Sequence, residues 1–139
     1  MNLPTVFMLI SVFIVTALGV AHLVYTSIVP RLGPRDPALL ESMRNARLLI
    51  TNETTVWKAW VGFNLSHSLC LLLFGAVFGY LALAHPLLLR ASWFLQIAGA
   101  ATLAAFVFLS HRYWFSVPLA GTSLALLCFL ASVVLSHRS

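Results

Sequence analysis

Charged residues are scarce in this chain of 139 residues. Asp, Glu, Lys and Arg together make up 8% of it and only three residues are acidic, while 61% are hydrophobic. A soluble domain carries a charged fraction of about 25%, which lets it present its surface to water. The composition therefore excludes an ordinary soluble protein and predicts one that lies in a membrane.

Other shortages narrow the chemistry. The two cysteines, Cys70 and Cys128, lie in apolar runs and form no C-x-x-C pair, so no disulfide framework is expected. Neither an H-E-x-x-H nor a Glu-x-x-His pattern occurs, so no metal site is predicted. The net charge of +5 comes from basic residues that flank apolar runs without forming a patch. This arrangement indicates membrane lipids, and not nucleic acid, as the partner of the basic residues.

The apolar residues fall into four long segments. At about 20 residues per membrane-spanning helix, four spans use most of the chain and leave no soluble domain. We expect a single integral membrane domain whose spans cover residues 3–29, 56–84, 88–110 and 117–136. The predicted fold class is all-α, a four-helix transmembrane bundle.

The segment between the first two spans holds most of the charge. Asp36 followed by Pro37 is typical of a helix N-cap and first turn, and apolar residues then recur at helical spacing as far as Ile50. This pattern predicts a short amphipathic interfacial helix between spans one and two. The helix breakers that precede it are Pro30, Gly33 and Pro34.

Basic residues are divided unevenly between the two sides of such a bundle. The side that holds both termini has Arg90 and Arg138, and the opposite side, which includes Arg112, has the other six Lys and Arg residues. Cytoplasmic loops carry the excess of basic residues in membrane proteins. The opposite side is therefore predicted to be cytoplasmic, with both termini outside the cytoplasm.

Polar and aromatic residues share one face of the second span. Glu53, Trp57, Trp60, Asn64 and His67 follow one another at steps of four, three, four and three, which places them on one side of a helix. An amide and an imidazole in a bilayer need partners, so this face is expected to turn toward protein or a wet cavity. The two tryptophans are also typical of an interfacial aromatic belt.

The first span contributes a histidine at the same depth. Because the first two spans are antiparallel, His22 and Asn64 are both expected about 10 Å below one membrane surface, with His67 one turn deeper. Tyr25 and Arg112 belong nearer the mouth. The candidate ligand-binding residues are therefore His22, Tyr25, Glu53, Trp57, Trp60, Asn64, His67 and Arg112.

The polar stretch of the second span also has a family likeness. Glu53 to Ser68 reads ETTVWKAWVGFNLSHS, and it occurs together with Ala21 to Tyr25 and Arg112 to Phe115. These stretches resemble a family of small bacterial integral membrane proteins with four predicted spans and an ETTxWxAWxGFNxSHS stretch. In that family a glycine is expected at the position of Cys70. The resemblance covers nearly the whole chain and implies a location in the cell inner membrane, but it supplies no activity.

Three kinds of function fit this site. A cytoplasm-facing polar pocket between helices one and two would bind a lipid, quinone or other small amphiphile, or would belong to a small subunit of a homo-oligomer or membrane assembly. A membrane enzyme would use His67 or Glu53 for acid–base chemistry, with Asn64 or Arg112 stabilising negative charge. A structural bundle would use the same side chains only to join helices. No cofactor is predicted, and haem held by His22 and His67 is a further alternative.

Overall fold

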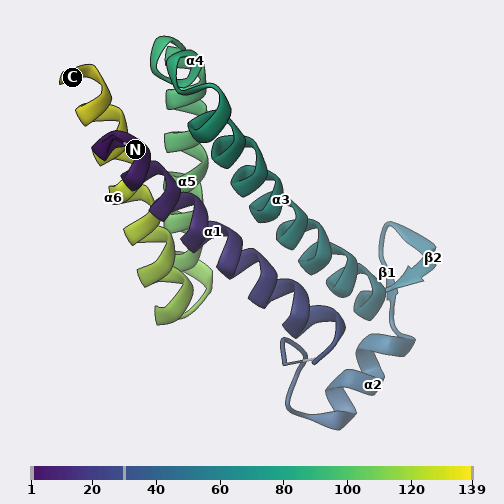
Figure 1. The fold of residues 1–139 in the computed structure, drawn as a ribbon. Coiled ribbons are helices and arrows are strands. Elements are labelled where there is room, and N and C mark those ends of the chain that lie inside the picture. The colour runs from purple at the N-terminus through teal and green to yellow at the C-terminus, as the bar shows by residue number, and fades with distance from the viewer. Residues whose placement is uncertain (1, 30, 139) are drawn as a thin grey trace. The chain divides into compact units, whose positions relative to one another are not determined.

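The protein is built almost entirely of helices (Figure 1). The structure, a computed structural model, describes residues 2–29 and 31–138, so the helix breaker expected at Pro30 lies outside the described residues. The elements in chain order are α1 (Leu3–Ser27), α2 (Pro37–Asn45), β1 (Arg47–Leu48), β2 (Thr51–Thr55), α3 (Val56–Ala84), α4 (Pro86–Ala91), α5 (Trp93–Tyr113) and α6 (Ser116–Arg138). The predicted all-α class is confirmed, with one short hairpin added to it.

Four helices in the described part of the chain, α1, α3, α5 and α6, are long and apolar enough to cross a membrane. The chain is therefore a multi-pass membrane protein. The third predicted span differs from the structure, because residues 86–91 form the separate helix α4 and α5 begins only at Trp93. Ser92 divides the two helices, since its hydroxyl accepts a hydrogen bond from the Leu95 backbone N–H at 3.3 Å as the N-cap of α5.

The predicted short helix is present as α2 between the first two spans. The Asp36 carboxylate accepts a hydrogen bond from the Ala38 backbone N–H at 2.9 Å, and Pro37 occupies the first turn. The predicted helix start is therefore confirmed. The helix ends at Asn45, earlier than the sequence pattern indicated.

An antiparallel hairpin takes the place of the predicted last turn of that helix. The strands β1 and β2 pair with Arg47 opposite Thr55, and the Arg47 guanidinium donates to the Asn52 carbonyl at 2.7 Å. Three of the five residues of β2 are threonines, whose branched side chains favour a strand over a helix. The expectation of a helix as far as Ile50 is therefore wrong.

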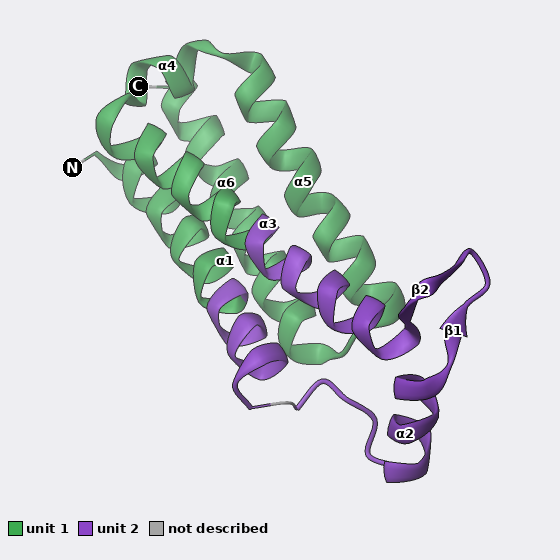
Figure 2. Ribbon diagram, turned by 90° about the vertical axis from the view of Figure 1, so that its right-hand side faces the viewer, with its two compact units in different colours: residues 1–18, 71–139 green, residues 19–70 purple. Residues whose placement is uncertain are grey.

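The chain forms two compact units, which Figure 2 shows in different colours. Unit 1 comprises residues 1–18 and 71–139, which include the first part of α1, the second part of α3, and α4 to α6. Unit 2 comprises residues 19–70, which include the end of α1, α2, the hairpin and the start of α3. The polar stretch that the sequence singles out in the second span belongs to unit 2.

Aromatic rings and small residues fill the core of unit 1. The rings of Phe78 and Phe129 meet edge to face, with 5.3 Å between their centroids. Gly99 on α5 lies so close to both rings that a Cβ atom there would clash with them. Ser11 on α1 donates its hydroxyl to the Ala125 carbonyl on α6 at 2.8 Å. Small residues thus let the helices of this unit approach closely, as is common in membrane bundles.

Candidate functional site

A hydrogen bond between α1 and α3 forms the centre of the candidate site. His22 Nε2 lies 2.9 Å from Asn64 Oδ1, and Asn64 is 8% exposed. The amide nitrogen of Asn64 donates to the Trp60 backbone carbonyl at 2.8 Å, which fixes the orientation of the amide. Its oxygen therefore faces His22, and Nε2 is the protonated donor in this bond. The bond uses only one of the two ring nitrogens of His22.

A second imidazole completes this cluster. The ring of His67, one helical turn after Asn64, meets the His22 ring edge to face, with 4.9 Å between the centroids and 63° between the planes. The sequence predicted that the amide and the imidazole of the second span turn toward the histidine of the first span. The structure confirms this meeting of the three side chains, which we call the imidazole–amide cluster.

Two hydroxyl groups beside the cluster are used within their own helices. Thr26 Oγ1 donates to the His22 carbonyl at 2.7 Å, and Ser68 Oγ donates to the Asn64 carbonyl at 3.0 Å. Hydroxyls in apolar helices commonly bond back to the preceding turn in this way. The imidazoles and the amide are therefore the side chains that carry polar chemistry between the two helices.

The aromatic candidates lie in the same unit, and two of them are steadied by the loop that follows α1. The indole of Trp57 packs against Gly33, where a Cβ atom would come within 3.3 Å of the ring. The guanidinium of Arg31 lies 5.6 Å from the ring centroid of Tyr25, within reach of a cation–π interaction. Tyr25 is 40% exposed and Trp60 is 42% exposed, so both keep an open aromatic surface.

Two candidate residues belong to neither α1 nor α3. Glu53 is an exposed residue of β2, because α3 begins only at Val56. Its predicted place on the face of the second helix is therefore wrong. The N-cap of α3 is Thr55, whose hydroxyl accepts from the Lys58 backbone N–H at 3.3 Å. Arg112 lies at the end of α5 in unit 1, where its guanidinium is 5.5 Å from the centroid of the neighbouring Tyr113 ring.

Sequence reasoning missed Gly33 and Arg31 as parts of this region. A glycine beside a proline was interpreted only as a helix breaker, although a residue without a side chain also lets a large ring pack on the backbone. Arg31 was counted only as a charge that sets topology. Arg31 lies six residues after Tyr25 and beyond the end of α1, so helical periodicity does not predict their contact.

The positions of the histidines bear on whether the site fits a metal ion or haem. Among residues 2–29 and 31–138, no group of three or more His, Cys, Asp or Glu side chains gathers where it would hold a metal ion. The rings of His22 and His67 are in direct contact, which leaves no room for a porphyrin plane between them. The observed arrangement therefore does not fit the haem alternative, which requires the two rings to separate.

Comparison with known proteins gives no relative on which to base a function. The chain matches no protein-family model, no curated protein and no solved structure. The likeness to small bacterial four-span proteins thus stays a prediction. An inference about function therefore starts from the imidazole–amide cluster, since a neutral imidazole has one nitrogen that donates and one that accepts a hydrogen bond.

Proposed function

We propose that this multi-pass membrane protein binds the polar head of a small amphiphile at the imidazole–amide cluster of His22, Asn64 and His67. The observation that carries the proposal is the contact of two imidazoles and a buried amide between two helices that are apolar enough to cross a membrane. Polar side chains inside a membrane span cost free energy, so they are commonly retained for a function.

The hydrogen bond that joins the two helices uses one ring nitrogen of His22. The bond between His22 and Asn64 already links α1 to α3, and it leaves Nδ1 of His22 outside that bond. His67 adds a second imidazole against the first. An imidazole donates to a carbonyl oxygen or accepts from a hydroxyl group, and these are the polar groups of a quinone and a quinol. The cluster therefore supports binding of such a head.

The charge of the cluster side chains indicates which kind of ligand head suits the site. His22, Asn64 and His67 include no Lys, Arg, Asp or Glu, so the cluster carries no permanent charge to neutralise an ionic head. An uncharged head with carbonyl or hydroxyl groups therefore suits it better than a phosphate. Tyr25 and Trp60, with their open aromatic surfaces, add apolar contact area for a ring. A quinone-type molecule is the ligand class that we favour.

We further propose that the cluster faces the cytoplasmic half of a bacterial inner membrane, with both termini outside the cytoplasm. Unit 2 contains Arg31, Arg35, Arg44, Arg47 and Lys58, and basic loops of this kind favour the cytoplasmic side. The acid–base enzyme alternative has less support, because Glu53 does not share a helix face with His67.

A quinone titration tests the proposal. The full chain, purified in mild detergent, is titrated with a short-chain ubiquinone while its tryptophan fluorescence is followed, because quinones quench nearby indoles. His67→Phe keeps a ring of similar size and removes the hydrogen-bonding nitrogens. Since one hydrogen bond contributes about 0.5–1.5 kcal/mol, we expect the dissociation constant to rise about two- to tenfold.

The control is His85→Phe, which removes an exposed imidazole in unit 1 that pairs with the Tyr80 hydroxyl. This variant should bind the quinone as the wild type does. Mass spectrometry of the organic extract of each preparation shows which amphiphiles leave the membrane with the protein. If the wild type and His67→Phe bind the quinone equally, or if no amphiphile co-purifies and none binds, the cluster only joins the helices.

A further inference from the structure

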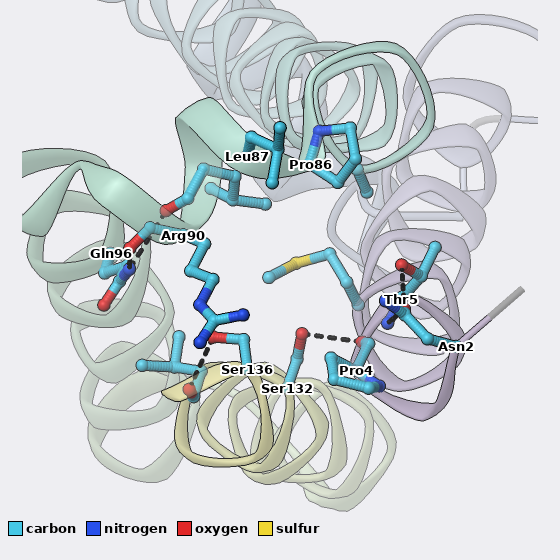
Figure 3. A pocket seen from close by; sticks show the side chains of 13 residues that line it. Asn2, Pro4, Thr5, Pro86, Leu87, Arg90, Gln96, Ser132 and Ser136 are labelled. Atoms are coloured by element: carbon cyan, nitrogen blue, oxygen red, sulfur yellow. Dashed lines mark hydrogen bonds between the residues drawn. The ribbon is translucent and has the colours of Figure 1, made fainter. Parts of the chain in front are cut away.

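A separate cavity lies within unit 1. It has a volume of about 130 Å³ and opens where the first turn of α1, helix α4, the start of α5 and the last turns of α6 meet (Figure 3). One water molecule needs only about 10–15 Å³ by the same kind of measure, so the cavity has room for a larger group. None of its lining residues belongs to the imidazole–amide cluster.

The charge of this cavity comes from Arg90. Its side chain extends from α4 across the cavity toward Ser136 on α6 (Figure 3). The three acidic residues of the chain, Asp36, Glu41 and Glu53, all belong to unit 2. Unit 1 therefore has no acidic side chain to pair with this guanidinium. An anion from outside the protein is the natural partner for an arginine placed in this way.

Hydrogen bonds hold the backbone around Arg90 in place. Gln96, which is 4% exposed, donates its amide to the carbonyls of Leu89 at 3.0 Å and of Arg90 itself at 2.7 Å. Its Oε1 lies 3.1 Å from His137 Nε2, and the His137 ring stacks on Trp93 at 4.9 Å. These bonds join the end of α4 to α5 and α6. The backbone that presents the guanidinium is therefore fixed before any ligand arrives.

A second donor lies just before the start of α1. The Asn2 side-chain oxygen accepts from the Thr5 backbone N–H at 3.1 Å and from the Thr5 hydroxyl at 2.6 Å. These two bonds orient the amide of Asn2 and leave its nitrogen as a donor at the cavity lining. Met8, Leu87 and Leu89 supply apolar surface beside these polar groups. The lining thus combines a cation, an amide and hydrocarbon contact.

We propose that this cavity binds a phosphate group, with the Arg90 guanidinium as its main partner and the Asn2 amide as a second donor. A guanidinium matches phosphate oxygens with two parallel hydrogen bonds. The cavity lies at the N-terminal end of α1 and the C-terminal end of α6, where membrane-spanning helices meet the layer of lipid phosphates. The apolar part of the lining favours a phospholipid over free phosphate.

Lipid retention tests this proposal. The full chain is delipidated in detergent, mixed with phosphatidylglycerol or with phosphatidylcholine at equal concentration, and examined by native mass spectrometry. The wild type should retain the anionic lipid preferentially. Because a basic residue near a membrane surface contributes about 1 kcal/mol, Arg90→Gln should lower the affinity for phosphatidylglycerol about fivefold. Arg90→Lys, which keeps the charge but not the paired donors, should fall between the two.

The matched control is Arg138→Gln, which removes a cation from the end of α6 that does not line the cavity. It should retain phosphatidylglycerol nearly as the wild type does, and circular dichroism confirms that each variant is folded. Inorganic phosphate is added in a parallel series. Displacement of the lipid by phosphate means that the cavity recognises the phosphate group alone, whereas no displacement means that it requires the whole lipid head.

Two results would overturn the proposal. The first is a wild type that shows no preference for the anionic lipid, which needs no variant to be informative. The second is an Arg138→Gln variant that loses as much lipid as Arg90→Gln, since this would indicate a general surface charge and not a site. Neither result bears on the quinone titration, because the imidazole–amide cluster shares no residue with this cavity.

Discussion

Replacement of Asn64 by leucine tests the hydrogen bond on which the candidate site depends. Leucine has nearly the same size as asparagine, so the change leaves no cavity in α3. It removes the acceptor that lies 2.9 Å from His22 Nε2 and leaves this ring N–H unpaired in apolar surroundings. An unpaired polar group of this kind costs about 1–3 kcal/mol. We expect Asn64→Leu to lower the free energy of unfolding by about 1–2 kcal/mol.

The interaction itself is isolated by a double-mutant cycle with His22→Phe. When both partners are replaced by apolar groups, no unpaired donor remains, so the double variant should cost less than the sum of the single variants. Hydrogen bonds between membrane helices couple by about 0.6 kcal/mol on average and by about 1.7 kcal/mol at most. We expect a coupling free energy within this range between His22 and Asn64.

The assay is reversible unfolding in mixed detergent micelles with increasing dodecyl sulfate, followed by helix circular dichroism. Ser66→Ala is the control, because the Ser66 hydroxyl donates to the carbonyl of Gly62 in its own helix, at 2.9 Å, and the residue is exposed. Its effect should be close to zero. A coupling between His22 and Asn64 below about 0.3 kcal/mol, the limit at which distant sites are additive, would refute the reasoning.

Further predictions concern the packing of the helices and the start of α2. Gly99→Ala places a methyl group against two phenylalanine rings and should lower the free energy of unfolding by about 1–3 kcal/mol. Gly62→Ala is its matched control: a Cβ atom there meets nothing within 4 Å, so the better helix former should stabilise α3 by up to about 1 kcal/mol. Both are measured by the same unfolding assay, and equal losses would contradict the packing argument. Asp36→Ala removes the N-cap of α2 and should destabilise that helix by about 0.5–2 kcal/mol, seen as faster amide exchange in residues 38–45. Unchanged exchange there would show that the cap does not stabilise α2.

Patterns in the sequence predicted most of the fold. Four apolar segments correspond to α1, α3, α5 and α6, because in a bilayer the length of an apolar run decides whether it can span. The start of α2 was predicted from Asp36 and Pro37, a local signal that acts through one hydrogen bond. The meeting of His22 with Asn64 and His67 was predicted from depth and helical spacing, since polar groups inside a membrane must find one another.

Features that depend on competition between neighbouring elements were not predicted. The apolar spacing of residues 39–50 suits a helix, but pairing of β1 with the threonine-rich β2 ends the helix at Asn45. The same hairpin removes Glu53 from the face of α3. Periodicity assumes one continuous element, so it cannot show where a helix gives way to a strand.

The sequence by itself determined that the chain lies in a membrane, how many helices are apolar enough to cross it and which polar side chains these helices carry. The reason is that hydrocarbon excludes charges and unsatisfied backbone groups, however the helices pack against one another. Only the tertiary structure decided how those side chains are used. The packing of Gly33 beneath Trp57 and the bonds of Gln96 that hold Arg90 at a cavity join residues with no periodic relation. Contacts of this kind arise when separate segments pack together, and no property of one segment alone contains them.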